Sequence, residues 1–419
     1  MTTAGIQAMY IYGGAAYLDV TELARHRQLD NARFENLLIK QKTVALPWED
    51  PVTFAVNAAK PIVDMLSDAE KNRIELLITC TESGIDFGKS LSTYVHHYLG
   101  LSRNCRLFEI KQACYSGTAG FQMALNFILS GVSPGARALV VTTDISRFTV
   151  AGRNEAPAED WSFAEPSSGA GGVAMLVSGE PTVFRADVGA NGYYGHEVMD
   201  ACRPLPDSEA GNVDLSLMTY MECSQQAYLE YRKRVTEADY RSSFQYLAFH
   251  TPFGGMVKGA HRTIMRKIVK ASPDEIELDF MQRVAPGLNY CQRVGNIMGG
   301  TVFMSLASII DNGNFDAPRR IGCFSYGSGC CSEFYSGMVT GEGQKQQQRL
   351  RIREQLDRRY RMSVADYERI VVNNTNLRFG MRDVTPDFHL IPEAWDKMNN
   401  TPQLYLKEIR DFHRKYEWR

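Results

Sequence analysis

Cys114 lies where a strand-like run of residues meets a helix-like run. Residues 107–110 suit a β-strand, residues 112–120 are mostly small, and an apolar run follows at 121–129. This order predicts a strand, a tight turn and a buried helix, with Cys114 at the junction. The dipole and the unpaired N–H groups of a helix N-terminus favour the thiolate, which is the nucleophilic form of cysteine. A packed and unreactive cysteine is the alternative, since cysteine is among the most buried residue types.

Three further motifs place polar side chains beside predicted strands. Glu82 follows the buried strand-like residues 74–80, and its carboxylate suits a general base or, alternatively, a turn or helix cap. His250 lies between a phenylalanine and Thr-Pro, where a structural histidine is the alternative. Residues 324–329, Phe-Ser-Tyr-Gly-Ser-Gly, predict a strand that breaks into a small-residue turn at Ser325. Such a turn brings backbone N–H groups close to a reacting oxyanion, unless it is a plain tight turn.

The composition excludes several classes of protein. The 419 residues carry a net charge of −2, so the chain lacks the polycationic character of a nucleic-acid binder. Nine cysteines without repeated CxxC spacing suit a reduced, cytoplasmic protein better than a disulfide framework. No signal peptide and no apolar run of about 20 residues is present. His96 and His97 are adjacent and would point apart, so we expect no metal site.

An internal repeat predicts the architecture. Four residues recur at a constant offset: Gly117, Phe121, Ile128 and Gly131 match Gly299, Phe303, Ile310 and Gly313. After each helix-like run, an arginine leads into an apolar strand-like run (138–141 and 321–324). We therefore predict two related α/β halves, 1–180 and 181–419, built on a mostly parallel sheet. Residues 151–168 and 203–212 read as loops. A polar extension begins at about 341, and its first part (341–360) reads as a solvated helix or linker.

Taken together, Glu82, Cys114, His250, Asn296 and the Ser325 turn resemble the HMG-CoA synthase family of the thiolase superfamily. The resemblance runs over most of residues 1 to about 340 and implies a thiolase-like fold, a five-layered αβαβα core. It also implies roles. Cys114 is acetylated, Glu82 removes a methyl proton, and His250 hydrogen-bonds the β-ketone of the second substrate. Asn296 would orient the incoming thioester or the histidine.

Departures from the family pattern point to one branch of it. Gly255 stands at or near the position of a lysine that helps hold coenzyme A, and Met298 replaces a tyrosine. Arg33 replaces the lysine of a Gly-Lys-Tyr segment. The run from His250 to Lys258 resembles enzymes of polyketide β-branching, which take their substrates from acyl carrier proteins. The expected partners are therefore an acetyl-acyl carrier protein as donor and a β-ketoacyl-acyl carrier protein as acceptor, with a homodimeric enzyme.

The carriers bring phosphopantetheine, and no cofactor bound to the enzyme itself is expected. Arg33 is a candidate for binding the phosphopantetheine phosphate by bidentate contact, and Lys258 is a second candidate. Carrier proteins are usually acidic, so basic residues at the entrance would help docking. Such residues follow the His250 loop on a predicted helix: Lys258, His261, Arg262, Arg266 and Lys267. A solvated helix face is the alternative for this set.

Three competing functions remain open from the sequence. The first is a ketoacyl synthase of the Cys-His-Asn type, which makes its enolate by decarboxylation and needs no glutamate base. The second is an HMG-CoA synthase that uses coenzyme A thioesters. The third is a thiolase-like partner protein without catalysis, which the presence of Cys114, Glu82 and His250 argues against.

Overall fold

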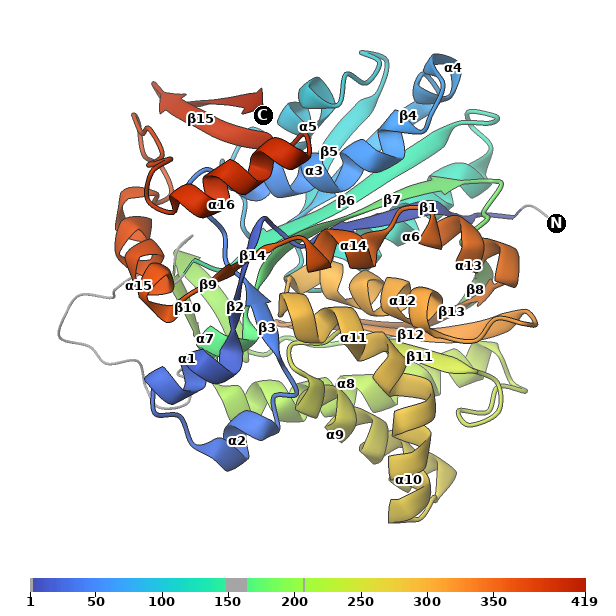
Figure 1. Ribbon diagram of the computed structural model, residues 1–419. Helices are drawn as coiled ribbons and strands as arrows, with labels where there is room; N and C mark the ends of the chain where they lie inside the picture. Colours follow the sequence, from blue (N-terminus) through green and yellow to red (C-terminus); the bar gives the residue numbers. More distant parts are fainter. Residues whose placement is uncertain (1–2, 148–163, 206–207) are drawn as a thin grey trace.

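A computed structural model describes residues 3–147, 164–205 and 208–419 of the chain (Figure 1). Hydrogen bonds join nine strands in the order β11-β12-β13-β8-β1-β7-β6-β4-β5. The strands are β1 (Gly5–Tyr12), β4 (Ile74–Cys80), β5 (Arg106–Ile110), β6 (Arg137–Ile145), β7 (Ala170–Ser178), β8 (Phe184–Gly195), β11 (Tyr246–Phe249), β12 (Arg319–Gly327) and β13 (Cys331–Val339). Among the described strands of this sheet, only the pairs β4–β5, β4–β6 and β11–β12 are parallel. The expectation of a mostly parallel sheet is therefore wrong, because β1, β7, β8 and β13 run antiparallel to their neighbours.

Helices cover both faces of the strands of the first half. On β6, a side chain at Gly117 or Gly120 of α6 (Ser116–Ser130) would touch Thr142 or Val140. On the other face, the hydroxyl of Thr143 donates to the carbonyl of Pro51 in α3 (Pro51–Asp64). Since successive side chains of a strand point to opposite faces, α3 and α6 lie on opposite sides of the sheet.

The strands of the second half have the same arrangement. Phe324 and Phe334 make edge-to-face contacts with Tyr220 and Tyr228 of α8 (Val213–Arg234). Tyr335, on the opposite face of β13, lies against Phe121 of α6. With α6 and α12 (Thr301–Asn312) between the two groups of strands, the layers are α3, strands, α6 with α12, strands and α8. The predicted thiolase-like αβαβα core is confirmed.

The predicted repeat corresponds to the two central helices. The rings of Phe121 and Phe303 meet edge to face with centroids 5.7 Å apart. The backbones of Gly117 and Gly299 touch, and a side chain on either glycine would collide with the other segment. Each helix leads to the equivalent strand, α6 to β6 and α12 to β12. Gly117 and Gly299 are therefore needed because the two segments approach each other closely there.

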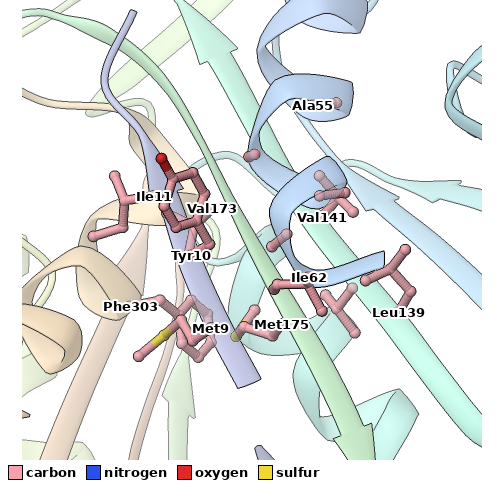
Figure 2. Packing of buried hydrophobic residues seen from close by; sticks show 14 of the residues in the cluster. Met9, Tyr10, Ile11, Ala55, Ile62, Leu139, Val141, Val173, Met175 and Phe303 are labelled. Atoms are coloured by element: carbon pink, nitrogen blue, oxygen red, sulfur yellow. The ribbon is translucent and has the colours of Figure 1, made fainter. Parts of the chain in front are cut away.

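Apolar side chains fill the space between the layers (Figure 2). Ala55 and Ile62 of α3 lie beside Val141 and Leu139 of β6, and Phe303 of α12 lies beside Met9 of β1, all of them labelled in Figure 2. These residues are almost fully buried, and fully burying such a side chain contributes roughly 1.5–3 kcal/mol. This packing fixes the ends of β4, β5 and β11, which are followed by the motifs of Glu82, Cys114 and His250.

The segment from 341 to 360 is largely helical, which is one of the two predicted alternatives, but its helices are partly buried and not simply solvated. It forms α13 (Gly341–Gln348) and α14 (Ile352–Asp357), which pack beside β1. The buried side chain of Gln347 donates to the carbonyl of Met9, and that of Gln355 bonds both the amide of Gly13 and the carbonyl of Gly14. Polar side chains here satisfy backbone groups at the end of β1, which composition alone does not reveal.

The C-terminal residues pack on the first half of the chain. The hairpin of β15 (Leu404–Arg410) and β16 (His413–Trp418) lies beside α3 (Figure 1). The Asn57 side chain donates to the carbonyl of Leu404 and accepts from its amide, at 3.0 and 2.8 Å. The buried Asp50 also accepts from Tyr416 and Arg414. The extension therefore completes the packing of the N-terminal half.

Two predicted loops have different outcomes. Residues 203–212 belong mainly to a hairpin of β9 (Ala201–Leu205) and β10 (Ser208–Gly211). The loop prediction is wrong there, because prolines are tolerated in this short two-stranded sheet. Most of 151–168 lies outside the described residues, and its end forms α7 (Ala164–Ser167). No helix of the described residues is long and apolar enough to span a membrane.

Candidate active site

The strand, turn and helix predicted around Cys114 are present. Cys114 is half-buried, between the end of β5 and the start of α6. Ala113 has a positive φ of 44° and Tyr115 closes the turn by donating to the carbonyl of Gln112. Left-handed backbone is strained for a residue with a side chain, and such strain is concentrated at functional sites. The turn thus presents the sulfur at the N-terminus of α6.

Two glycines from the second half hold the turn from the other side. A Cβ built on Gly327 would lie 2.6 Å from both the carbonyl oxygen of Gln112 and the amide nitrogen of Tyr115. A Cβ built on Gly299 would lie 2.6 Å from the hydroxyl of Ser116 and 3.6 Å from the carbonyl oxygen of Cys114. Both positions require glycine because the backbones touch. The end of β12 and the turn before α12 therefore form the walls around Cys114.

Glu82 lies at the end of β4, on a turn organised by Asp144. The Asp144 Oδ1 atom accepts from the Thr81 hydroxyl at 3.0 Å and from the amides of Glu82 and Ser83 at 2.9 and 3.0 Å. Asp144 is the eighth residue of β6 and is fully buried. Sequence reasoning missed it, although an acid near the end of a buried strand is the same signal that singles out Glu82.

Arg203 of β9 lies beside the carboxyl groups of Glu82 and Asp144. Its Nε atom lies 3.3 Å from Glu82 Oε1, and both side chains are mostly buried. Burial raises the pKa of Asp144 to about 6, while the charge of Arg203 lowers it. The guanidinium therefore keeps negative charge stable in a site that excludes most water. The residues around Arg203, which were predicted to form a loop, form strand β9, and this strand positions the guanidinium.

His250 is the first residue after β11 and is 1% exposed. Its amide donates to the carbonyl of Phe324, and its own carbonyl accepts from the hydroxyl of Tyr220 at 2.6 Å. Within the described residues, its Nδ1 atom has no hydrogen-bond partner. Burial lowers the pKa of His250 to about 3. The imidazole is therefore neutral at physiological pH and suits hydrogen bonding to a substrate oxygen better than a charge contact.

Ser325 neighbours the histidine but is not part of a turn. It pairs with Glu333 inside β12, and the strand continues to Gly327. Its hydroxyl is buried and has no partner among the described residues. The turn itself follows at 328–330, where Asp200 accepts from the amide of Gly329 at 2.9 Å and from the hydroxyl of Tyr326. The prediction that the strand breaks at Ser325 is therefore wrong by two residues.

Asn296 lies on the turn before α12. Its Oδ1 atom accepts from the Met298 amide at 2.9 Å and from the Thr301 hydroxyl at 3.1 Å. Its backbone bonds the segment before β7, from its amide to Ser167 and from the Gly169 amide to its carbonyl. The backbone of Asn296 therefore joins the turn before α12 to the segment before β7.

Arg33 lies on α2 (Asn31–Glu35), which is held against the loop that follows His250. The Gly254 amide donates to the carbonyl of Leu37 at 2.8 Å. At Gly255 any side chain would run into the carbonyl oxygen of Asn36. Gly255, which stands at or near the position expected for a coenzyme A-binding lysine, therefore has a structural role here. A glycine at this position allows the segment after α2 to approach α9 (Gly254–Ile264).

The predicted basic face is present only in part. Arg262, Arg266 and Lys267 are exposed, on α9 and on the π-helical turn Met265–Val269. Lys258 pairs with Glu277 at 2.8 Å. His261 is buried between Tyr240 and Asp279, so its assignment to the exposed face is wrong. It occupies the inner stripe of the amphipathic helix, four residues after the buried Val257 and three before the buried Ile264.

No group of three or more potential metal ligands occurs in the described parts of the chain. The site instead gathers a thiol, a carboxylate, a neutral imidazole and an amide at the ends of β4, β5 and β11 and before α12. These groups suit acyl transfer to sulfur and proton removal from carbon.

Comparison with known proteins gives the family. Residues 2–182 match the "Hydroxymethylglutaryl-coenzyme A synthase N terminal" family and residues 259–419 match "Hydroxymethylglutaryl-coenzyme A synthase C terminal". The chain is 66% identical over 418 residues, all of both chains, to the polyketide biosynthesis 3-hydroxy-3-methylglutaryl-ACP synthase PksG of Bacillus subtilis. It is 34% identical to a hydroxymethylglutaryl-CoA synthase of Enterococcus faecalis, over 87% of this chain and 91% of that one. The protein therefore belongs to the hydroxymethylglutaryl-CoA synthase family.

Solved structures give the same result. The curacin biosynthetic pathway HMG synthase in complex with holo donor-ACP superposes with a TM-score of 0.96 at 62% identity, over the whole of both chains. The same enzyme in complex with acetyl donor-ACP also gives a TM-score of 0.96. A structure of MvaS with 3-hydroxy-3-methylglutaryl coenzyme A gives 0.84 at 29% identity. The resemblance to the polyketide branch, expected from the residues after His250, is confirmed.

Proposed function

We propose that the protein is a 3-hydroxy-3-methylglutaryl synthase of polyketide β-branching. It joins an acetyl group from an acetyl-acyl carrier protein to a β-ketoacyl chain on a second carrier. The observation that carries this proposal is the site itself. Cys114 lies at a helix N-terminus after β5, and Glu82 follows the neighbouring strand β4. His250 follows β11, whose partner strand β12 ends at Gly327 against the Cys114 turn. The high identity to relatives named as ACP-dependent HMG synthases supports the choice of carrier-bound substrates.

The first step is acetyl transfer. The Cys114 thiolate attacks the acetyl carbonyl, the carbon–sulfur bond to phosphopantetheine breaks, and the released thiolate takes a proton. Backbone N–H groups at the start of α6 stabilise both the attacking thiolate and the tetrahedral oxyanion. The small residues around the turn leave room for the thioester.

The second step forms the carbon–carbon bond. Glu82 removes a proton from the methyl group of acetyl-Cys114, and the resulting enolate carbon attacks the β-ketone of the acceptor. Neutral His250 donates a hydrogen bond to the ketone oxygen and stabilises the alkoxide that develops there. Asn296 and Ser325 line the same site and orient the thioesters. Water then cleaves the bond to Cys114, and the acceptor leaves with a new carboxymethyl branch.

Carrier-bound donors account for the departures from the coenzyme A pattern. Gly255 removes a nucleotide-binding lysine and brings the segment after α2 against α9. This contact sets Arg33 beside the entrance, where its guanidinium suits the phosphopantetheine phosphate. Arg262, Arg266 and Lys267 offer a basic face to an acidic carrier. Lys258 is the weakest member of the proposed set, because it already pairs with Glu277.

We further propose a cytoplasmic homodimer. β5 ends the nine-stranded sheet, and an edge strand is a template for pairing with a second chain. Met123 of α6 and Val132 just after it are 49% and 69% exposed. The nine cysteines are free thiols, which suits a reducing compartment. Sedimentation of the purified protein checks the dimer, and a monomer at micromolar concentration would refute it.

A peptide map tests the proposed nucleophile. After treatment with acetyl-carrier protein, the acetyl label should lie on Cys114, and Cys114→Ser should take up none, because serine has no dedicated base here. A matched control is Cys105→Ser, whose sulfur is half-buried outside the site and should leave labelling unchanged. A label on Cys80 or Cys105 in the wild type would remove the basis of the mechanism.

A further inference from the structure

Glu333 is a buried carboxylate that the proposed reaction does not use. It lies on β13 and is 1% exposed. Its register partner is Ser325 of β12, and partners across a strand pair point to the same face. Glu333 therefore points into the central helix layer, toward the nucleophile turn, and not toward α8. A charge at such a depth needs partners that offset its lost hydration.

Three hydrogen-bond donors provide that compensation. The Tyr115 hydroxyl donates to Oε2 at 2.6 Å. The side-chain amides of Gln122 and Asn191 donate to Oε1 at 2.8 and 3.1 Å. Burial raises the pKa of Glu333, and the bonds from Tyr115 and Asn191 oppose that rise. The pKa of Tyr115 is raised by burial and by Glu333, so the phenol keeps its proton and remains the donor.

Tyr115 connects this network to the nucleophile. Tyr115 directly follows Cys114 and is the N-cap residue of α6, where no side-chain capping bond forms. Its amide is the group that lies against Gly327. The start of α6 is therefore fixed through the Tyr115 side chain and not through a capping hydroxyl or carboxylate. The hydrogen bond from the Tyr115 hydroxyl to Glu333 is short, at 2.6 Å.

We propose that Glu333 is a positioning residue, which acts through Tyr115 to fix the orientation of the Cys114 sulfur for attack on the donor thioester. This inference rests on the proposed role of Cys114 as nucleophile. The proposed reaction assigns the network no contact with the substrates. Its loss therefore changes the rate of acetyl transfer at saturating donor and not the donor concentration that gives half-saturation.

Rapid-quench acetylation followed by intact-mass measurement tests the proposal on the full-length protein. Glu333→Gln turns one acceptor into a donor that faces other donors, and Tyr115→Phe removes the hydroxyl alone. Each should lower the maximal acetylation rate about tenfold or more, since small misplacements of a reacting group carry such costs. Half-saturating donor should change less than twofold. The double variant should be no slower than the slower single variant, because both remove one interaction.

The chain contains a matched control. Glu49 is another buried carboxylate that accepts a tyrosine hydroxyl, from Tyr12 at 3.0 Å, but it lies beside the C-terminal extension. Glu49→Gln should lower the melting temperature and leave the maximal acetylation rate within about twofold. A Glu333→Gln protein that acetylates like the wild type, or single-variant effects that multiply in the double variant, would overturn the proposal. Absence of any acetyl adduct in the wild type would instead refute the role of Cys114 itself.

Discussion

At the scale of single residues, burial and hydrogen bonds determine the protonation and the position of the side chains in this site. His250 is neutral because it is buried and its ring meets no compensating charge among the described residues. Asp144 holds the Glu82 turn through three hydrogen bonds to one oxygen. Residue types in the sequence identify candidates for these roles. Their protonation depends on burial, which only the folded chain defines.

The buried His250 makes the stability of the fold depend on pH. Its pKa is about 3 in the folded protein, whereas an unfolded histidine has a pKa near 6.5. The unfolded chain therefore binds the proton first, and stability falls as pH drops below about 6.5. Between pH 7.5 and 5 this one group should remove about 2 kcal/mol of unfolding free energy.

Urea unfolding of the wild type and of His250→Asn measures this contribution. The wild type should lose about 2 kcal/mol more than the variant over that pH range. Parallel pH profiles of the two proteins would mean that His250 has the same pKa in the folded and the unfolded chain. Burial would then not be what keeps the imidazole neutral.

At the scale of elements, the sequence predicts the order of neighbouring strands, turns and helices well. It predicts poorly which distant residues form hydrogen bonds with one another. The strand, turn and helix around Cys114 follow from neighbouring residues, and the repeat predicts that Gly117 and Gly299, 182 positions apart, are equivalent. It does not predict that their backbones touch. The burial of Gln347 could not be predicted in this way, because its partner is a carbonyl on β1. The contact of Arg203 with Glu82 could not be predicted either, because the stretch that contains Arg203 reads as a loop and not as strand β9.

The junction of the C-terminal hairpin with α3 gives a test at this scale. Asn57→Ala removes two hydrogen bonds to Leu404 and leaves that buried backbone unsatisfied, at a cost of about 2–4 kcal/mol. Hydrogen exchange should accelerate first in residues 404–418. The control Asp64→Asn breaks a half-exposed ion pair with Lys60 on the same helix and should cost less than about 1 kcal/mol. Equal effects of both variants would show that the hairpin is held mainly by other contacts.

At the scale of the whole molecule, the candidate catalytic residues lie apart from the candidate carrier-docking residues. The central layers hold Cys114 and its neighbours, whereas α2 and α9 lie together at the periphery with the basic residues (Figure 1). Long-range charge acts mainly on the rate at which an acidic carrier associates. On the proposed function, the donor would be selected at the surface, by groups that take no part in bond making.

Arg266→Glu should slow acetylation by acetyl-carrier protein severalfold at low salt and leave the slower reaction with acetyl-CoA unchanged. The difference should shrink above about 0.15 M salt, where the screening length is about 8 Å. Arg349→Glu is the control, since it reverses an exposed charge on α13, away from the basic face. Equal loss with both donors would assign Arg266 to the fold and not to docking.

The most direct measurement is the mass of the acceptor carrier after one reaction cycle. The protein is incubated with acetyl-carrier donor and a β-ketoacyl-carrier acceptor, and all chains are weighed intact. The acceptor should gain the elements of acetic acid, from one acetyl group and one water, while Glu82→Gln stops at acetyl-Cys114 with the acceptor unchanged. An acceptor that gains mass only when acetyl-CoA replaces the acetyl-carrier, or that gains it at the wild-type rate with Glu82→Gln, would contradict a carrier-fed condensation with Glu82 as the base.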